Sequence, residues 1–175
     1  VIFGDGAGAA VVTRSDDGSG ILSTHLHSQG AHAKELALIG PATTRWVDKI
    51  IEDSDSDDLS YYPYMNGNFV FKHAVTRFPQ VIMEALDQNG LTPKDIDLLV
   101  PHQANLRIAQ FIQRTMKLND DQVYNNIMKY GNTTAASIPI ALHDGIKSGK
   151  ITQGQKVILE AFGAGFTWGS ALLEV

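Results

Sequence analysis

The 175-residue sequence contains no cysteine and no long apolar stretch. Without cysteine, the chain can form no disulfide and no thiolate-ligated zinc site, and it carries no thiol nucleophile. It has no run of 18 apolar residues and no signal-peptide pattern, so we expect a soluble, cytoplasmic protein that does not span a membrane. The formal net charge of −5 argues against general nucleic-acid binding, but it leaves room for a local basic patch.

Hydrophobic residues make up 43% of the chain, enough for one sizeable core. Apolar patterns of strand and helix type alternate along the sequence, which predicts an α/β fold. The predicted strands are two around a glycine-rich turn within 1–14, then 21–28, 96–101, 123–127, 156–162 and 166–175. The predicted helices are 68–89, 104–117 and 135–147. Asn68 is expected to cap the first helix, and the acidic stretch 51–60 to form a solvated loop.

The two ends of the chain have similar sequences. VIFGDGAGAAVV at the start and VILEAFGAGFTWGSALLEV at the end each combine an apolar strand, Gly-Ala-Gly and a second apolar strand. This similarity suggests a duplicated architecture, with one whole repeat preceded by the tail of an earlier one. Two short matches arise equally well by chance. A missing first half would explain why the chain begins at Val1 inside an apolar run.

His102 and Asn132 are the candidate residues for chemistry. His102 directly follows a predicted strand, and Asn132 lies between a predicted strand and a helix, which is where open α/β sheets bind ligands. A neutral imidazole and a carboxamide can both donate to one carbonyl oxygen and stabilise the oxyanion or enolate that it becomes. The Gly163–Gly165 turn offers backbone N–H groups for a second oxyanion site. A structural histidine and a turn asparagine remain the plainer interpretation of these two residues.

Four motifs together resemble a known family. VPHQANLRI, YGNTTAAS, MNGNFVFK and LEAFGAGFTWGSALLEV, in this order, closely resemble the C-terminal half of β-ketoacyl-acyl carrier protein synthase III, a condensing enzyme of fatty acid synthesis. The resemblance covers essentially the whole chain. It implies a thiolase-like fold of two α/β halves, with residues 1–64 as the tail of the first half and a connecting segment, and 65–175 as the second half.

The resemblance also implies a reaction and a set of partners. The family performs a decarboxylating Claisen condensation of a short acyl-CoA, such as acetyl-CoA, with malonyl-acyl carrier protein, without cofactor or metal, as a homodimer. Its catalytic set is Cys-His-Asn, so His102 and Asn132 would serve a cysteine on polypeptide preceding Val1. This chain alone is then expected to be inactive.

Further site residues carry over by the same resemblance. Ala164 would supply an oxyanion-hole N–H, and Phe162 would border the nucleophile. The residues expected around the pantetheine tunnel are Asn105, Ala104, Asn68 and Gly67. The residues expected to dock the acidic carrier protein are Arg107, Lys72 and Arg114. Alanine stands at 164 where many relatives have glycine; it keeps the backbone N–H, but its methyl group restricts φ in that turn.

Other functions receive little support. In GDGAGA the third glycine is misplaced for a dinucleotide fingerprint, and a strand rather than a helix is predicted to follow. The acidic stretch 51–60 lacks the glycine and glutamate of a calcium loop. His25, His27 and His32 occur in a stretch ordinary for the resembled family, so we expect no metal. The alternatives kept are a related synthase of a specialised metabolite and a noncatalytic half-protein that binds carrier protein.

Overall fold

Four strands form one mixed sheet in the order β1-β6-β5-β4. The computed structural model describes residues 3–38 and 63–175. The strands are β1 (Gly20–Ser28), β4 (Leu98–Pro101), β5 (Lys156–Gly163) and β6 (Thr167–Glu174). β6 lies antiparallel to both β1 and β5, whereas β4 and β5 are parallel. The predicted strands at 21–28, 96–101, 156–162 and 166–175 are therefore confirmed.

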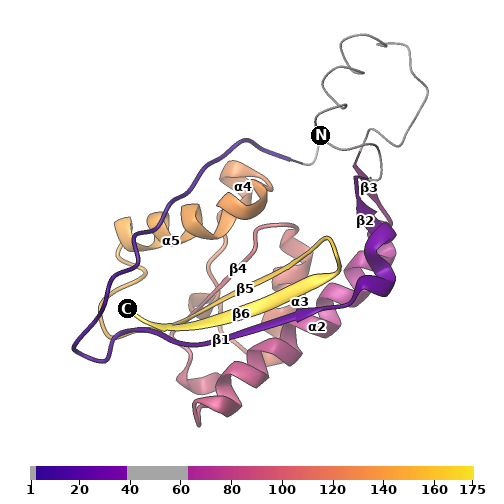
Figure 1. Cartoon of the computed structure of the whole chain (residues 1–175). Coiled ribbons are helices and arrows are strands. Elements are labelled where there is room, and N and C mark those ends of the chain that lie inside the picture. Colours follow the sequence, from indigo (N-terminus) through magenta and orange to yellow (C-terminus); the bar gives the residue numbers. More distant parts are fainter. Residues whose placement is uncertain (1–2, 39–62) are drawn as a thin grey trace.

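Helices cover both faces of this sheet (Figure 1). On one face lie α2 (Gly67–Gln88) and α3 (Leu106–Met116), and on the other α4 (Ile127–Tyr130) and α5 (Ser137–Lys147). The larger core cluster joins Phe78, Ile82 and Ile112 of the first pair to Ile158 and Leu172 of the sheet. The smaller cluster packs Ala141 of α5 against the opposite face. This arrangement confirms the α/β prediction.

The start of α2 differs from the prediction by two residues. Asn66, not Asn68, caps the helix, because its Oδ1 accepts a hydrogen bond from the Phe69 N–H at 3.4 Å. Asn66 also donates through Nδ2 to Glu35 at 2.9 Å, which ties the cap to the preceding segment. The predicted end at Asn89 is confirmed, since Asn89 is the C-terminal cap of this helix.

The helices at 104–117 and 135–147 are confirmed with shorter starts. Asn105 caps α3 by accepting from the Arg107 N–H at 3.0 Å. A 3₁₀ turn, η5 (Thr134–Ala136), precedes α5, so the α-helix itself begins at Ser137. Thr134 has a φ of 51°, which marks a sharp change of direction at this point.

The predicted strand at 123–127 is wrong. Val123 forms only a single parallel bridge with Leu99, and α4 begins at Ile127. The physical reason is a competing acceptor. The Gln103 side-chain oxygen accepts the N–H groups of Asn126 and Ile127 at 3.0 and 3.1 Å, so a neighbouring strand cannot use them.

The predicted strand–turn–strand at 1–14 is also not formed among the described residues 3–14. Phe3 makes one bridge with Asn132, and the chain that follows has no ladder partner. This extended segment runs past α5 in Figure 1. Val11 and Val12 are 92% and 78% exposed. A strand needs a neighbouring strand for its N–H and C=O groups, and this segment has none in the described chain.

Smaller elements complete the described chain. They are η1 (Gly30–Glu35), the paired strands β2 (Leu36–Ala37) and β3 (Tyr64–Met65), η3 (Pro93–Asp95) and η4 (Asp120–Gln122). The expected acidic loop at 51–60 lies outside the described residues. Among the helices of the described residues, none is both long and apolar enough to cross a bilayer.

Candidate functional site

His102 lies immediately beyond the carboxyl end of β4, as the sequence predicts. All four residues of β4 are buried, and the strand pairs with β5 through Pro101 and Glu160. The His102 N–H extends that pairing by donating to the Glu160 carbonyl at 2.7 Å. The backbone of His102 is therefore fixed by the sheet, while its ring projects from the end of the strand.

The His102 ring is held by a serine at the start of α5. Its Nδ1 lies 2.6 Å from the Ser137 Oγ, and Ser137 is the first residue of α5. Burial lowers the pKa of His102 below its usual 6.5, because desolvation disfavours the imidazolium. The neutral ring then has one donor nitrogen and one acceptor nitrogen.

Asn132 is fixed by two hydrogen bonds that leave its amide nitrogen unused within the described chain. Its backbone carbonyl oxygen accepts a hydrogen bond from the Gly4 N–H at 2.8 Å. Its side-chain Oδ1 accepts one from the Thr134 N–H at 2.9 Å. Gly131, with a φ of 70°, provides the turn that brings the chain into this position. The Asn132 Nδ2 donates to no atom of the described residues, so its N–H groups are available to a ligand.

One short segment, 132–137, thus carries both Asn132 and the hydroxyl that contacts His102. Gln103, the residue after His102, contacts this segment through its N–H, which donates to the Ser137 Oγ at 3.2 Å. Its side chain is fixed on both sides: Nε2 donates to the Pro101 carbonyl at 2.7 Å, and Oε1 accepts from the Asn126 and Ile127 N–H groups. Gln103 and Ser137 are 3% and 2% exposed. Sequence reasoning missed both residues, although each lies inside a motif that it singled out, PHQAN and GNTTAAS.

A buried carboxyl group lies next to this framework. Glu160 is 1% exposed, and neither of its side-chain oxygens has a hydrogen-bond partner among the described residues. Burial therefore raises its pKa well above the usual 4.5, which favours the neutral acid. The Glu160 carbonyl holds His102, so the carboxyl group sits on the strand that positions the histidine.

The structure places the remaining predicted site residues in three groups. Ala104 and Asn105 follow His102 directly, and the Ala104 N–H donates to the His102 carbonyl at 2.8 Å. Gly67 and Asn68 form the exposed first turn of α2. The third group is the β5–β6 turn.

In that turn, Phe162 packs inside an aromatic cluster with Phe166 and Trp168, at ring distances of 4.9 and 6.3 Å. Ala164 lies at the exposed tip, and its N–H has no acceptor among the residues described. The geometry thus leaves this N–H available, but the assigned roles of Phe162 and Ala164 stay predictions.

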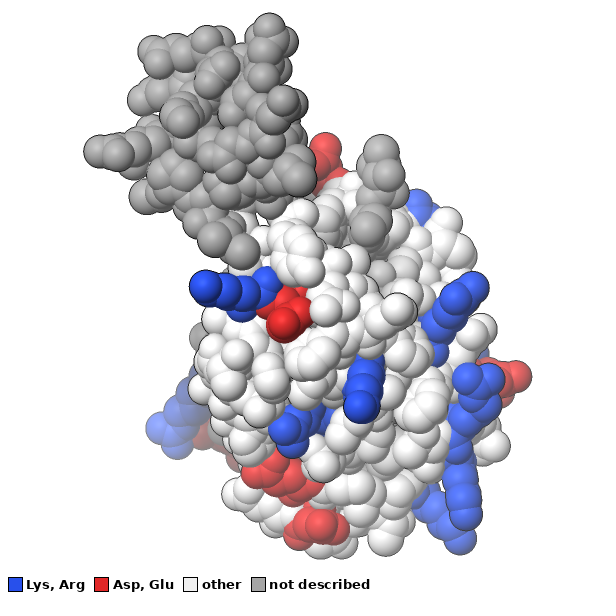
Figure 2. Space-filling view, turned by 90° about the vertical axis from the view of Figure 1, so that its right-hand side faces the viewer, with Lys and Arg blue, Asp and Glu red and all other residues white. Residues whose placement is uncertain are grey.

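The predicted docking residues are exposed on neighbouring helices. Lys72 lies on α2, Arg107 and Arg114 on α3, and these two helices pack against each other. Figure 2 shows the side of the molecule where α2 begins; lysine and arginine side chains lie along its right-hand edge and also across its middle and left, with acidic side chains among them. The overall charge of the sequence is negative, so such basic groups stand out as a local feature.

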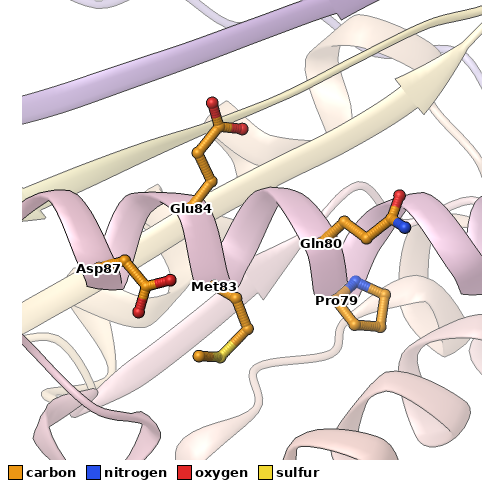
Figure 3. A pocket seen from close by; sticks show the side chains of 5 residues that line it. All are labelled: Pro79, Gln80, Met83, Glu84 and Asp87. Atoms are coloured by element: carbon orange, nitrogen blue, oxygen red, sulfur yellow. The ribbon is translucent and has the colours of Figure 1, made fainter.

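Two surface hollows lie away from His102 and Asn132. One is a groove along α2 lined by Pro79, Gln80, Met83, Glu84 and Asp87 (Figure 3). The other lies between α4 and α5, lined in part by Tyr124 and Asp144. Neither brings together groups for catalysis, and we assign the site from the hydrogen-bond geometry instead.

His25 and His27 contact a carboxylate. The His27 Nε2 lies 2.6 Å from Glu84 and the His25 Nδ1 lies 3.5 Å from it. The hydrogen bond with His27 lowers the pKa of Glu84 below its usual 4.5. No group of three or more potential metal ligands occurs within residues 3–38 and 63–175.

Comparisons with known proteins decide the family. A family model described as 3-oxoacyl-[acyl-carrier-protein] synthase III C terminal matches residues 86–175, and the model of 3-oxoacyl-[acyl-carrier-protein] synthase III matches residues 1–30. This chain belongs to the 3-oxoacyl-[acyl-carrier-protein] synthase III family. The resemblance inferred from the motifs is thereby confirmed.

Individual relatives agree with this assignment. The chain is 48% identical to a β-ketoacyl-[acyl-carrier-protein] synthase III of Alkalilimnicola ehrlichii and 47% identical to that of Rhodospirillum centenum; each match covers 99% of this chain and 51% of the relative. The crystal structure of the synthase III from Thermus thermophilus is 40% identical with a TM-score of 0.81, covering 94% of this chain and 49% of that one. The thiolase-like fold class is confirmed. The chain spans about half the length of the curated relatives it matches. The domain boundary near residue 65 stays a prediction.

Proposed function

We propose that this chain supplies the C-terminal half of the active site of a β-ketoacyl-acyl carrier protein synthase III. The supporting observation is the paired donors: a neutral His102 held at the end of β4, and an Asn132 whose Nδ2 is available to a ligand. In this proposal both donate to the thioester carbonyl of malonyl-acyl carrier protein. The names of the relatives include acyl carrier protein, and an acyl thioester and a malonyl-acyl carrier protein are the substrates we propose here.

The reaction proceeds in two stages. An acyl group moves from acyl-CoA to a cysteine thiolate on the half of the protein that precedes this chain: the new C–S bond forms as the old one breaks, and CoA leaves as the thiolate. The malonyl group then loses CO2, and the electron pair of the broken C–C bond forms an enolate whose oxygen accepts from His102 and Asn132. The enolate carbon attacks the acyl-cysteine carbonyl, the C–S bond breaks, and the thiolate is regenerated. Donors aimed at a developing oxyanion are worth about 2.7–4 kcal/mol each.

The remaining residues have supporting roles in the proposal. Ala164 offers its N–H to the tetrahedral intermediate, and Phe162 borders the cysteine. Asn105, Ala104, Gly67 and Asn68 line the approach of the pantetheine arm. Arg107, Lys72 and Arg114 attract the acidic carrier protein, because opposite charges steer association. We place the enzyme in the cytoplasm as a homodimer without a bound cofactor.

The first test is the coding DNA upstream of Val1 in the source genome. An in-frame extension of comparable length, with a cysteine in a strand-to-helix turn, supports the proposal. A start codon immediately before Val1 contradicts it and favours a noncatalytic half-protein.

The second test measures malonyl-carrier protein decarboxylation and condensation by the protein as its gene encodes it. His102→Ala and Asn132→Ala are each expected to lower the decarboxylation rate about 10²–10³-fold. His143→Ala, at an exposed position of α5, is the matched control and retains the rate. Unchanged decarboxylation in His102→Ala contradicts the assignment.

A third test concerns the carrier protein. Charge reversal at Arg107 or Lys72 is expected to raise the KM for the carrier-bound substrate and to weaken its salt dependence, with kcat retained. Lys147→Glu, on α5 across the sheet, is the control. A KM equal to that of the control variant rejects these residues as the docking site.

A further inference from the structure

Among the described residues, the Ser137 hydroxyl has only one hydrogen-bond acceptor to which it can donate its proton. Its Oγ accepts a hydrogen bond from the Gln103 N–H at 3.2 Å and lies 2.6 Å from the His102 Nδ1. A hydroxyl has one proton to donate and two lone pairs that accept. The backbone N–H of Gln103 donates to one lone pair of the Ser137 oxygen. Among the residues that the structure describes, the His102 Nδ1 is the only acceptor within reach of the hydroxyl proton.

We propose that Ser137 is a positioning residue that fixes the tautomer of His102, by donating its hydroxyl proton to Nδ1. This inference rests on the proposed function for its consequence. With Nδ1 accepting, the neutral ring carries its hydrogen on Nε2, so that Nε2–H is the group directed at the substrate carbonyl. The opposite tautomer would present a lone pair to the carbonyl oxygen and repel it.

The surroundings of Ser137 hold the hydroxyl in place. Ser137 is 2% exposed and is the first residue of α5, where its own backbone is set by the turn that follows Asn132. Gln103 is 3% exposed, and its side chain is fixed by the Pro101 carbonyl. The lone pair of the hydroxyl therefore meets a buried amide, and its proton faces the half-buried His102 ring.

The same serine links the two donors of the site. Asn132 begins the segment that ends at Ser137, and the Asn132 side chain shapes that segment by accepting from the Thr134 N–H. The distance between the helix start and the histidine is thus set by the same turn that presents Asn132. Ser137 couples the placement of the amide donor to the protonation pattern of the imidazole donor.

The test is nitrogen NMR of the protein as its gene encodes it, with ¹⁵N-labelled histidine. His102→Gln assigns the His102 signals by their loss. At a pH where His102 is neutral, the wild-type protein should show a protonated Nε2 and an unprotonated Nδ1. Ser137→Ala should mix the two tautomers, whereas Ser137→Thr, which keeps the hydroxyl, should retain the wild-type pattern. Ser170→Ala is the matched control, because Ser170 is also a buried serine but donates to Val81 on the other side of the sheet.

Kinetics supply a second readout. Ser137→Ala should lower kcat for malonyl decarboxylation about 10-fold with little change in KM, as expected for one lost hydrogen bond to the catalytic ring. Ser137→Thr should restore most of the rate. A protonated Nδ1 in the wild-type protein, or a Ser137→Ala spectrum identical to the wild type, overturns the inference. A protein that lacks condensing activity but shows the predicted tautomer refutes the proposed function alone, so the two failures are distinguishable.

Discussion

The two glycine-rich ends of this chain have similar sequences and different structures. VILEAFGAGFTWGSALLEV folds into β5, a tight turn and β6, in the middle of the sheet. VIFGDGAGAAVV, within its described residues, forms an extended segment with a single bridge at Phe3. In the first, Gly163 and Gly165 belong to the turn. In the second, the glycines recur at every other residue.

The glycines at every other position of the first segment have a different structural role from the glycines at the β5–β6 turn. Gly4, Gly6 and Gly8 lie on one side of an extended chain, and that side faces the loop and helix around Asn132. A Cβ on Gly4 would lie 2.5 Å from the Tyr130 carbonyl oxygen, and one on Gly8 would lie 2.3 Å from Pro139. The absence of side chains thus allows close backbone approach. The pattern Gly-x-Gly is thus compatible with either a turn or a close approach between two backbone segments. Which of the two forms depends on the segments that pack against it.

The largest expected difference between the two ends is in stability. Leu172→Ala in β6 removes a fully buried side chain and should lower the free energy of unfolding by about 2–5 kcal/mol. Val12→Ala, in the exposed segment, should change it by less than about 0.5 kcal/mol. Urea denaturation of both variants measures this. Similar losses would mean that the first segment is also packed in a core.

Substitution of an alternate glycine should have an intermediate effect. Gly8→Ala forces a methyl group into Pro139, and overpacking of this kind costs about 1–3 kcal/mol. Gly30→Ala is the matched control, since a Cβ there meets no atom within 4 Å. The same denaturation experiment compares them. Equal stability of the two variants would show that the segment does not hold its place beside α5.

A pH-dependent difference concerns the acidic residue near each Gly-Ala-Gly. Burial keeps Glu160 protonated in the folded protein above pH 4.5, whereas the unfolded chain releases that proton near its usual pKa. The unfolded state then binds fewer protons, so the free energy of unfolding falls as pH rises above about 4.5. Glu160→Gln should remove this component, and its stability relative to wild type should increase between pH 4 and pH 7.

Asp5 provides the matched comparison for Glu160, because its side chain is exposed. Asp5→Asn should change the free energy of unfolding by less than about 0.5 kcal/mol at neutral pH. Parallel pH–stability curves for wild type and Glu160→Gln would show that the Glu160 carboxyl group reaches solvent or a partner.

The predictable parts of this molecule are those set by local pattern. The β5–β6 hairpin, β1, β4 and the three main helices follow from apolar periodicity and glycine positions, and so does the position of His102 at the end of β4. Asn132 instead lies between α4 and η5, because the strand predicted before it does not form. The predictions that were wrong or missing depended on contacts between residues far apart in the sequence. Asn66 caps α2 with help from Glu35, and Gln103 takes the donors that a strand at 123–127 would need. Ser137 was overlooked for the same reason: its role exists only when α5 is packed beside β4.

Sheet order also has a consequence for biosynthesis. Every strand pair of the four-stranded sheet includes β5 or β6, the last two strands to leave the ribosome. β1 is made long before its partner β6, and β4 must wait for β5. The sheet therefore cannot form before β5 and β6 have been synthesised, and the placement of His102 beside it is completed only when both strands have left the ribosome.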